Sequence, residues 1–183
     1  MPDPRPGRLR RVAAELFGER RATNLRAVVC SVPWMRREVL SGVDHPLADL
    51  VAASSAVPGL LAPQRVSGHW YVDGGVRSTV SVDLASRARR LLVIAPIAGP
   101  MFGPAGRLTD WILRREMATW RSANPTGKLW LIQPDPAIAA LACWPGHLFD
   151  VDRAKRCFDL ARRQGDQLLA RWDRDDDGDP AVV

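Results

Sequence analysis

Apolar residues recur along the chain in two periods, which predict helices alternating with strands. Leu9, Val12 and Leu16 share one helical face, so a short amphipathic helix is predicted over residues 8–20. Residues 25–32 form a β-branched run of strand length, and residues 91–95 form a continuous apolar run, typical of a strand covered on both faces. This alternation indicates an α/β layered fold.

The remaining elements follow from turn residues and apolar spacing. Pro46 occupies a first helical position, and the helix it begins is predicted to end at Pro58-Gly59. A second strand is predicted to end at Asp73, where Gly74-Gly75 breaks it. Three later elements are expected: a short helix over 82–89, a helix from Leu108 to Ala118 and a strand over 129–132.

The last predicted helix has the clearest apolar pattern. Its apolar residues alternate steps of three and four: Val151, Ala154, Phe158, Ala161, Gly165, Leu168 and Trp172. Such a stripe suits a coiled-coil seam, but we expect one helix docked on a sheet. Residues 1–172 are predicted to form one domain, and the acidic residues 173–183 a flexible tail.

Composition and charge narrow the class of protein. Hydrophobic residues make up 46% and charged residues 25% of the 183 positions, as in an ordinary globular protein. The net charge of +6 suits an anionic partner, either lipid headgroups or nucleic acid. Neither a signal sequence nor an apolar run of membrane-spanning length is visible, so we expect a cytoplasmic protein, with peripheral membrane contact as an open alternative. Cys30, Cys143 and Cys157 are widely spaced and form no C-x-x-C pair, so neither a zinc site nor a disulfide framework is expected.

Asp73 is the candidate catalytic residue. Alone, Asp-Gly is a turn dipeptide. Here the sequence reads as a helix ending in Ala-Ser-x-Ala-x-Pro-Gly (residues 53–59), a short link, and then a strand ending in Tyr71-Val72-Asp73-Gly74-Gly75-Val76. This order resembles the patatin-like phospholipases, whose catalytic aspartate lies in an Asp-Gly-Gly or Asp-Gly-Ala motif. The resemblance is specific over residues 25–98 and weaker from there to residue 172. Many members carry Asn and Pro where Thr79 and Ser81 stand here.

The resemblance implies a three-layer α/β/α sandwich and hydrolysis of an acyl ester, such as a phospholipid, by a Ser–Asp dyad. Asp73 would be the base that activates the serine, because a hydroxyl is a poor nucleophile until its proton is removed. Gly74 and Gly75 would complete the motif and remove side chains that would crowd the site. No metal or organic cofactor is implied.

The nucleophile and the oxyanion loop are missing from these 183 residues. The family nucleophile lies in a Gly-x-Ser-x-Gly elbow. The single pair of glycines four positions apart is Gly99 and Gly103, and Met101 stands between them. The two adjacent glycines belong to the aspartate motif, so no glycine-rich oxyanion loop is present. We therefore expect an incomplete sandwich, truncated before its nucleophile-bearing part, and no hydrolase activity from the chain alone.

Two other function classes remain open. The first is a non-catalytic patatin-like module that binds lipid or a protein partner. The second is a basic nucleic-acid-binding domain, which is less favoured because the arginine clusters lack interleaved aromatic residues. The tail residues Asp173, Asp175 and Asp177 imitate a calcium loop but lack its twelfth-position glutamate. No oligomeric state follows from the sequence.

Overall fold

The structure is a computed structural model that describes residues 7–99, 103–142, 147 and 150–172. The chain divides into two compact units, Met1–Ser78 and Thr79–Val183. No change in composition marks this boundary in the sequence. The assignment of residues 1–172 to one patatin-like domain stays a prediction, and the predicted flexible tail, 173–183, lies outside the described residues.

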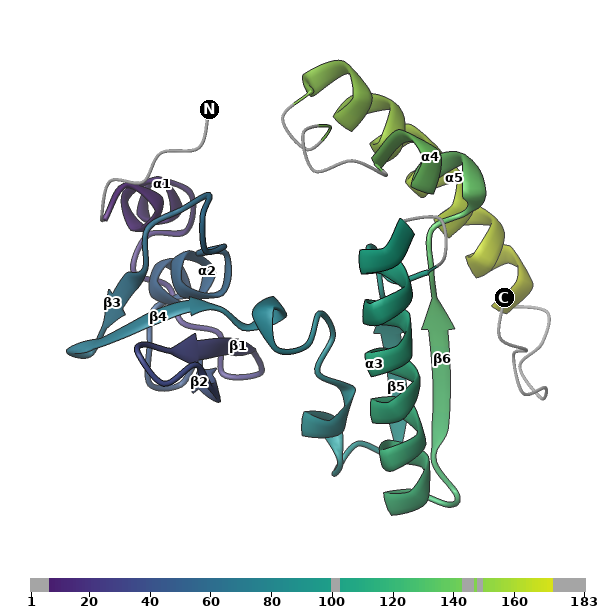
Figure 1. Cartoon of the computed structure of the whole chain (residues 1–183), viewed down its shortest axis with the longest axis horizontal. Helices are drawn as coiled ribbons and strands as arrows, with labels where there is room; N and C mark the ends of the chain where they lie inside the picture. The colour runs from purple at the N-terminus through teal and green to yellow at the C-terminus, as the bar shows by residue number, and fades with distance from the viewer. Residues whose placement is uncertain (1–6, 100–102, 143–146, 148–149, 173–183) are drawn as a thin grey trace. The chain divides into compact units, whose positions relative to one another are not determined.

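The first unit is a four-stranded antiparallel sheet with helices on one side (Figure 1). The strands lie in the order β2-β1-β4-β3, and β1 and β4 are the central pair. The helices and strands of this unit are α1 (Arg8–Phe17), β1 (Arg26–Ser31), β2 (Arg36–Ser41), α2 (Leu47–Ser54), β3 (Gln64–Val66), β4 (His69–Asp73) and the short 3-10 helix η1 (Gly74–Val76).

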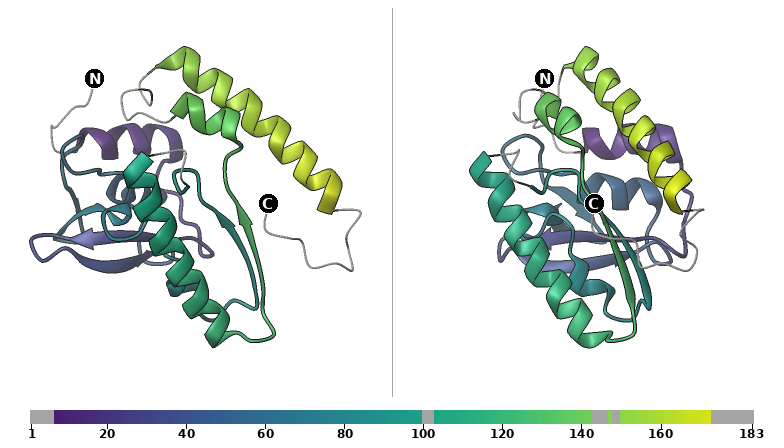
Figure 2. Two further views of the ribbon diagram at one scale, coloured as in Figure 1. Left: turned by 45° about the vertical axis from the view of Figure 1, so that its right-hand side comes forward. Right: turned by 90° about the vertical axis from the view of Figure 1, so that its right-hand side faces the viewer.

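Helix α2 covers one face of this sheet and makes the core of the first unit. The buried cluster joins Leu50 and Ala53 of α2 to strand residues that share the covered face: Val29, Leu40, Val66 and Tyr71. Helix α1 packs on α2, where the Arg10 guanidinium pairs with the Asp49 carboxylate. The right-hand view of Figure 2 shows α1 and α2 on the same side of the sheet.

Over its described residues, the second unit contains a two-stranded parallel sheet and three α-helices. Strands β5 (Arg90–Ile94) and β6 (Lys128–Ile132) pair in parallel, and α3 (Gly103–Ala123) connects them. Leu113, Met117 and Trp120 of α3 pack against Val93 and Leu131 of the strands. The unit also contains η2 (Val82–Ala85), α4 (Pro136–Ala142) and α5 (Val151–Trp172).

The prediction that residues 91–95 are covered on both faces is wrong. Val93 is buried against α3, but Leu92 and Ile94 point to the other side and are exposed, Ile94 to 61%. A continuous apolar run does not distinguish a strand covered on both faces from one covered on a single face, because both are rich in Leu, Val and Ile.

The apolar stripe predicted on the last helix is not docked on a sheet. Helix α5 has the predicted bounds, but Val151 and Phe158 are exposed. The helix contacts α4 and is tied to the segment after β6 by Gln164, whose amide nitrogen donates to the Gln133 carbonyl oxygen and to Asp135. The side chain of Trp172 lies outside the described residues.

The α/β class is confirmed, since helices and strands alternate along much of the chain. The three-layer arrangement stays a prediction. Strands β2 and β3 and helix α4 were not predicted from the pattern. Of the helices that the structure describes, none has the length and apolar character needed to cross a membrane.

Candidate functional site

Asp73 is the last residue of β4, at the point where the sheet of the first unit gives way to η1. It is half-buried and lies opposite Val29 of the neighbouring central strand. Its carboxylate oxygen Oδ1 accepts a hydrogen bond of 2.7 Å from the amide of Gly75, so the side chain caps the 3-10 turn that follows. This bond fixes the orientation of the carboxylate.

Gly74 is required by the close approach of the neighbouring strand. A Cβ added there would lie 2.5 Å from the carbonyl oxygen of Val28 and 2.7 Å from its carbonyl carbon. These are backbone atoms of a central strand and cannot move aside. A Cβ on Gly75 would instead lie 3.0 Å from Asp73 Oδ1, so a side chain there would press on the carboxylate itself. The two glycines therefore have different roles, one in packing and one beside the carboxylate.

The Ala-Ser-x-Ala-x-Pro-Gly segment meets the aspartate directly. The amide of Asp73 donates a 3.0 Å hydrogen bond to the carbonyl oxygen of Ala56, which is fully buried. The chain then turns, with the Leu61 amide bonded to the Val57 carbonyl oxygen and Gly59 at a φ of 83°. In the sequence these two segments were related only by their order along the chain. In the structure a hydrogen bond connects them and holds the backbone of Asp73.

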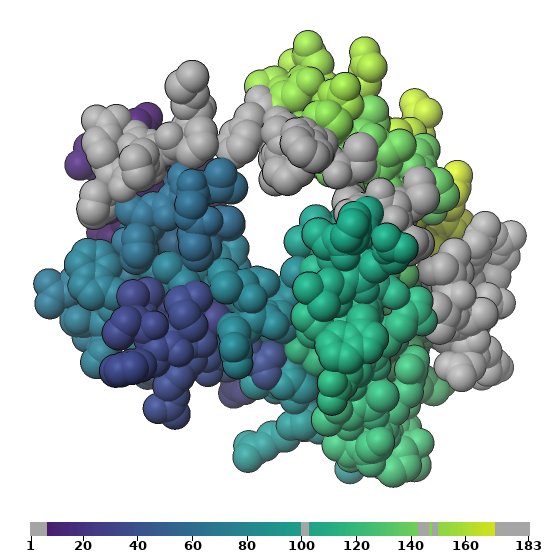
Figure 3. Space-filling model, in the orientation of Figure 1, coloured from purple at the N-terminus to yellow at the C-terminus, as the bar shows by residue number. Residues whose placement is uncertain are grey.

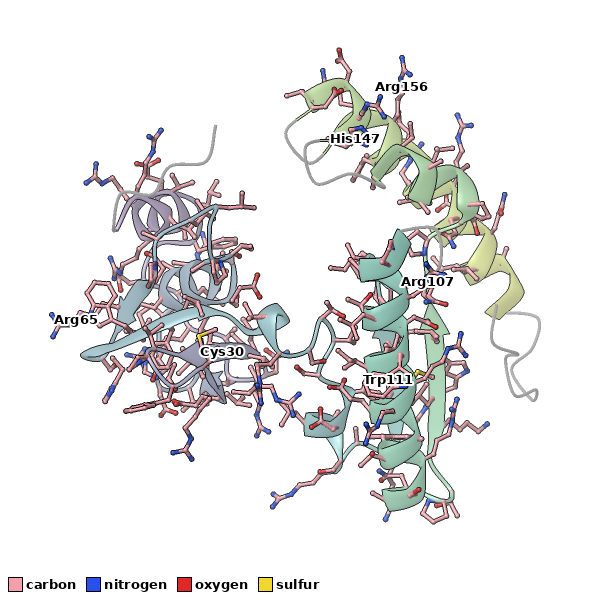
Figure 4. The ribbon with its side chains drawn as sticks, in the orientation of Figure 1. Cys30, Arg65, Arg107, Trp111, His147 and Arg156 are labelled. Atoms are coloured by element: carbon pink, nitrogen blue, oxygen red, sulfur yellow. The ribbon has the colours of Figure 1, made fainter. Side chains whose placement is uncertain are left out.

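Cys30 is a neighbour of this site that the sequence did not single out. It lies opposite Val72 in β1, is fully buried, and is visible in the middle of the first unit in Figure 4. Burial raises the pKa of the Cys30 thiol, the positive charges of Arg77 and Arg37 oppose that shift, and the Asp73 and Glu38 carboxylates add to it. The thiol is therefore held in its protonated, unreactive form.

Other candidate chemistry does not gather around Asp73. Of the histidines, His69 is exposed at the start of β4, and His45 meets Ser67 across 3.4 Å. In the part of the chain that the structure describes, no three His, Cys, Asp or Glu side chains come close enough together to hold a metal ion. Met101, the centre of the single Gly-x-x-x-Gly spacing, lies outside the described residues.

Comparison with known proteins supports the assignment made from the motif. Residues 8–86 match the family model described as patatin-like phospholipase, a family of lipid hydrolases. No curated protein matches the chain. The matched range includes Asp73 and the segments that contact it. It begins before residue 25, where the resemblance read from the sequence becomes specific, and it ends before β5. Residues 8–86 are therefore patatin-like in sequence, as the resemblance predicted, and this range contains Asp73, Gly74 and Gly75. The roles of these three residues stay predictions.

Proposed function

We propose that this chain supplies the aspartate of a patatin-like Ser–Asp acyl hydrolase and has no hydrolase activity by itself. The observation that carries the proposal is the fixed position of Asp73. Its carboxylate accepts a hydrogen bond from the Gly75 amide, and its backbone amide donates one to the Ala56 carbonyl oxygen. A base in such a dyad must be placed within hydrogen-bond reach of the serine hydroxyl, and a side chain fixed at a strand end meets that need.

The chemistry assigns a separate task to each carboxylate oxygen. Oδ1 accepts the Gly75 amide, so Oδ2 would take the proton of the serine as its Oγ attacks the ester carbonyl carbon. The same proton would pass to the departing alcohol. In the second half of the reaction, Asp73 would take a proton from the water that attacks the acyl-serine and return it to the serine Oγ.

The serine and the oxyanion donors are the components that this chain does not provide. None of its nine serines stands between glycines in a Gly-x-Ser-x-Gly elbow. Removing the serine of a hydrolase costs on the order of a millionfold in rate, and removing one oxyanion donor about a hundredfold or more. The substrate of the complete site would be an acyl ester of a lipid.

The first test compares two proteins. The 183-residue chain is expected neither to hydrolyse a short-chain nitrophenyl ester above the buffer rate nor to react with a fluorophosphonate probe. The same chain extended by the in-frame sequence encoded upstream of Met1 is expected to do both if that sequence contains Gly-x-Ser-x-Gly, and Asp73→Asn should then abolish both. Labelling of the short chain, or full activity of the extended Asp73→Asn variant, would contradict the proposal.

A further inference from the structure

The sheet of the first unit has a second face, turned away from α2, which we call the outer face. Side chains alternate along a strand, and residues directly opposite each other point to the same side. Val29, Leu40 and Tyr71 face α2. The register therefore places the following residues on the outer face: Arg26, Val28, Cys30, Arg37, Val39, Arg65, Trp70 and Val72. Cys30 and Val72, in the middle of this face, are buried, whereas Val39 and Trp70 are exposed, as are Arg26 and Arg65.

The outer face carries positive charge and no acidic side chain in any of its four strands. Its charged residues are Arg26, Arg37 and Arg65. The acidic residues of these strands are Glu38 and Asp73, and both stand opposite Val29, on the side of the sheet that α2 covers. Glu38 also accepts a hydrogen bond from the Tyr71 hydroxyl there. Figure 4 shows Arg65 projecting outward from the edge of the first unit.

Aromatic and branched apolar side chains are exposed at one end of this face. Val32, just past β1, donates its amide to the carbonyl oxygen of Trp70, and Trp70 stands opposite Arg65. Trp70 is 44% exposed, and Trp34, at the turn between β1 and β2, is 80% exposed. The β1–β2 hairpin, dark blue in Figure 3, lies at the surface of the first unit. Trp70, Val32 beside it, and Trp34, two residues after Val32 in the chain, are together called the tryptophan cluster below.

We infer that the tryptophan cluster and the exposed arginines of the outer face, Arg26 and Arg65, bind an anionic lipid bilayer. Tryptophan is enriched at the membrane–water boundary because its ring is apolar and its N–H is polar. Arginines placed near a bilayer surface are attracted to anionic headgroups, each by about fivefold in affinity. An acidic protein partner would meet the same arginines, but a protruding, highly exposed tryptophan at a hairpin turn is better suited to insertion between headgroups. The occupant is therefore a lipid surface, with the hairpin turn as the inserted part.

The inference goes beyond the proposed dyad, because it concerns binding alone. It is tested by sedimenting the purified full chain with phosphatidylcholine vesicles, with and without phosphatidylglycerol. Binding is expected for the vesicles that contain phosphatidylglycerol and is expected to weaken as salt rises. Trp34→Ser is expected to weaken it about tenfold. Vesicle binding is measured without any hydrolysis, so this inference and the hydrolase proposal can fail independently of each other.

Matched controls come from the second unit. Trp111 of α3 is also an exposed tryptophan, 54% accessible, with the Arg115 guanidinium 4.9 Å from its ring centroid. Trp111→Ser should leave vesicle binding unchanged. Arg65→Gln should weaken it about fivefold, whereas Arg163→Gln on the exposed side of α5 should not. Lipids with bromine on their acyl chains should quench tryptophan emission in the wild-type chain, and Trp34→Ser should remove much of that quenching.

Several outcomes would overturn the inference. These are failure to bind vesicles at low salt, equal binding with and without phosphatidylglycerol, and loss of binding in Trp111→Ser but not in Trp34→Ser. Concentration-dependent self-association that Trp34→Ser abolishes, without vesicle binding, would show that the outer face is a protein interface instead. Circular dichroism of each variant establishes that the compared chains are equally folded.

Discussion

Gly74 lies against the backbone of Val28 so closely that no side chain fits between them. An added Cβ would lie 2.5 Å from the Val28 carbonyl oxygen, in the middle of a four-stranded sheet. The glycine beside the aspartate is therefore required by the packing of β1, whatever chemistry Asp73 performs. The Asp-Gly-Gly motif therefore has two separate causes, the packing of Gly74 and the chemistry of Asp73, which the sequence alone does not distinguish.

Gly74→Ala is expected to destabilise the chain by about 3 kcal/mol or more, because either the sheet or the turn must shift. Gly75→Ala is the matched control. Its Cβ would meet the end of the Asp73 side chain at 3.0 Å, so the carboxylate can move and the loss should stay within about 1 kcal/mol. Urea unfolding followed by circular dichroism measures both. Equal losses for the two variants would show that the approach of Val28 is not the cause.

Trp120 is the largest fully buried side chain of the second unit, at 1% exposed. Its Nε1–H donates to the Ala85 carbonyl oxygen at 3.0 Å, which connects α3 to η2. Trp120→Ala is expected to cost about 3–5 kcal/mol, since it leaves a cavity and an unpaired carbonyl. Trp111→Ala on the exposed side of the same helix should cost less than about 1 kcal/mol. The difference between their thermal midpoints checks this, and comparable losses would place Trp120 outside the core.

Helices and strands could be predicted where the apolar pattern was long or where glycine or proline marked the end of the element. The strand ending at Asp73 and the helix from Pro46 were found because Gly and Pro mark their ends. Strand β2 was not found because Arg36 and Arg37 read as a basic cluster. Helix α4 was missed although Asp135-Pro136, a cap residue and a first-turn proline, signals its start.

The candidate site was predictable in its residues but not in its contacts. Asp73 followed from a motif, whereas the hydrogen bond from its amide to Ala56 needs the fold to bring two segments together. Cys30 gave no signal because a lone cysteine in an apolar strand is most often a core residue. The exposure of Ile94 could not be foreseen either, since the same apolar run suits a strand covered on one face or on two.

Cys30 provides a prediction about pH. Burial raises the pKa of its thiol, so the folded chain holds this proton more tightly than the unfolded chain does. Its contribution to stability is therefore full below the unfolded pKa of about 8.5 and is lost as pH rises through the folded pKa. The free energy of unfolding should fall over that alkaline range, and Cys30→Ala should reduce the slope. If Cys30→Ala leaves the slope of unfolding free energy against pH unchanged, other titrating groups cause that slope. Native Cys30 should also alkylate more slowly than the partly exposed Cys157.

Gly165 offers a stabilising change in α5. It lies within a 22-residue helix, and an added Cβ would meet nothing within 4 Å. Gly165→Ala should therefore raise the stability of the second unit by about 0.5–1 kcal/mol, because glycine loses more backbone freedom in a helix than alanine does. An increase in thermal midpoint is the expected readout. A decrease would mean that a partner closely approaches this position in solution.

Asp73 itself can be tested for the less specific alternative, in which it only caps a turn. Asp73→Ala removes the acceptor of the Gly75 amide and should cost about 1 kcal/mol. Asp73→Asn keeps an oxygen acceptor for that amide, so its stability should stay within about 0.5 kcal/mol of the wild-type chain. An amide cannot accept the proton of a serine, so Asn would preserve the turn and remove the base. In a serine-bearing, active form of the protein, a fully stable but inactive Asp73→Asn variant would separate the two roles. An active Asp73→Asn variant would show that Asp73 only caps the turn through its hydrogen bond with the Gly75 amide and does not act as a base.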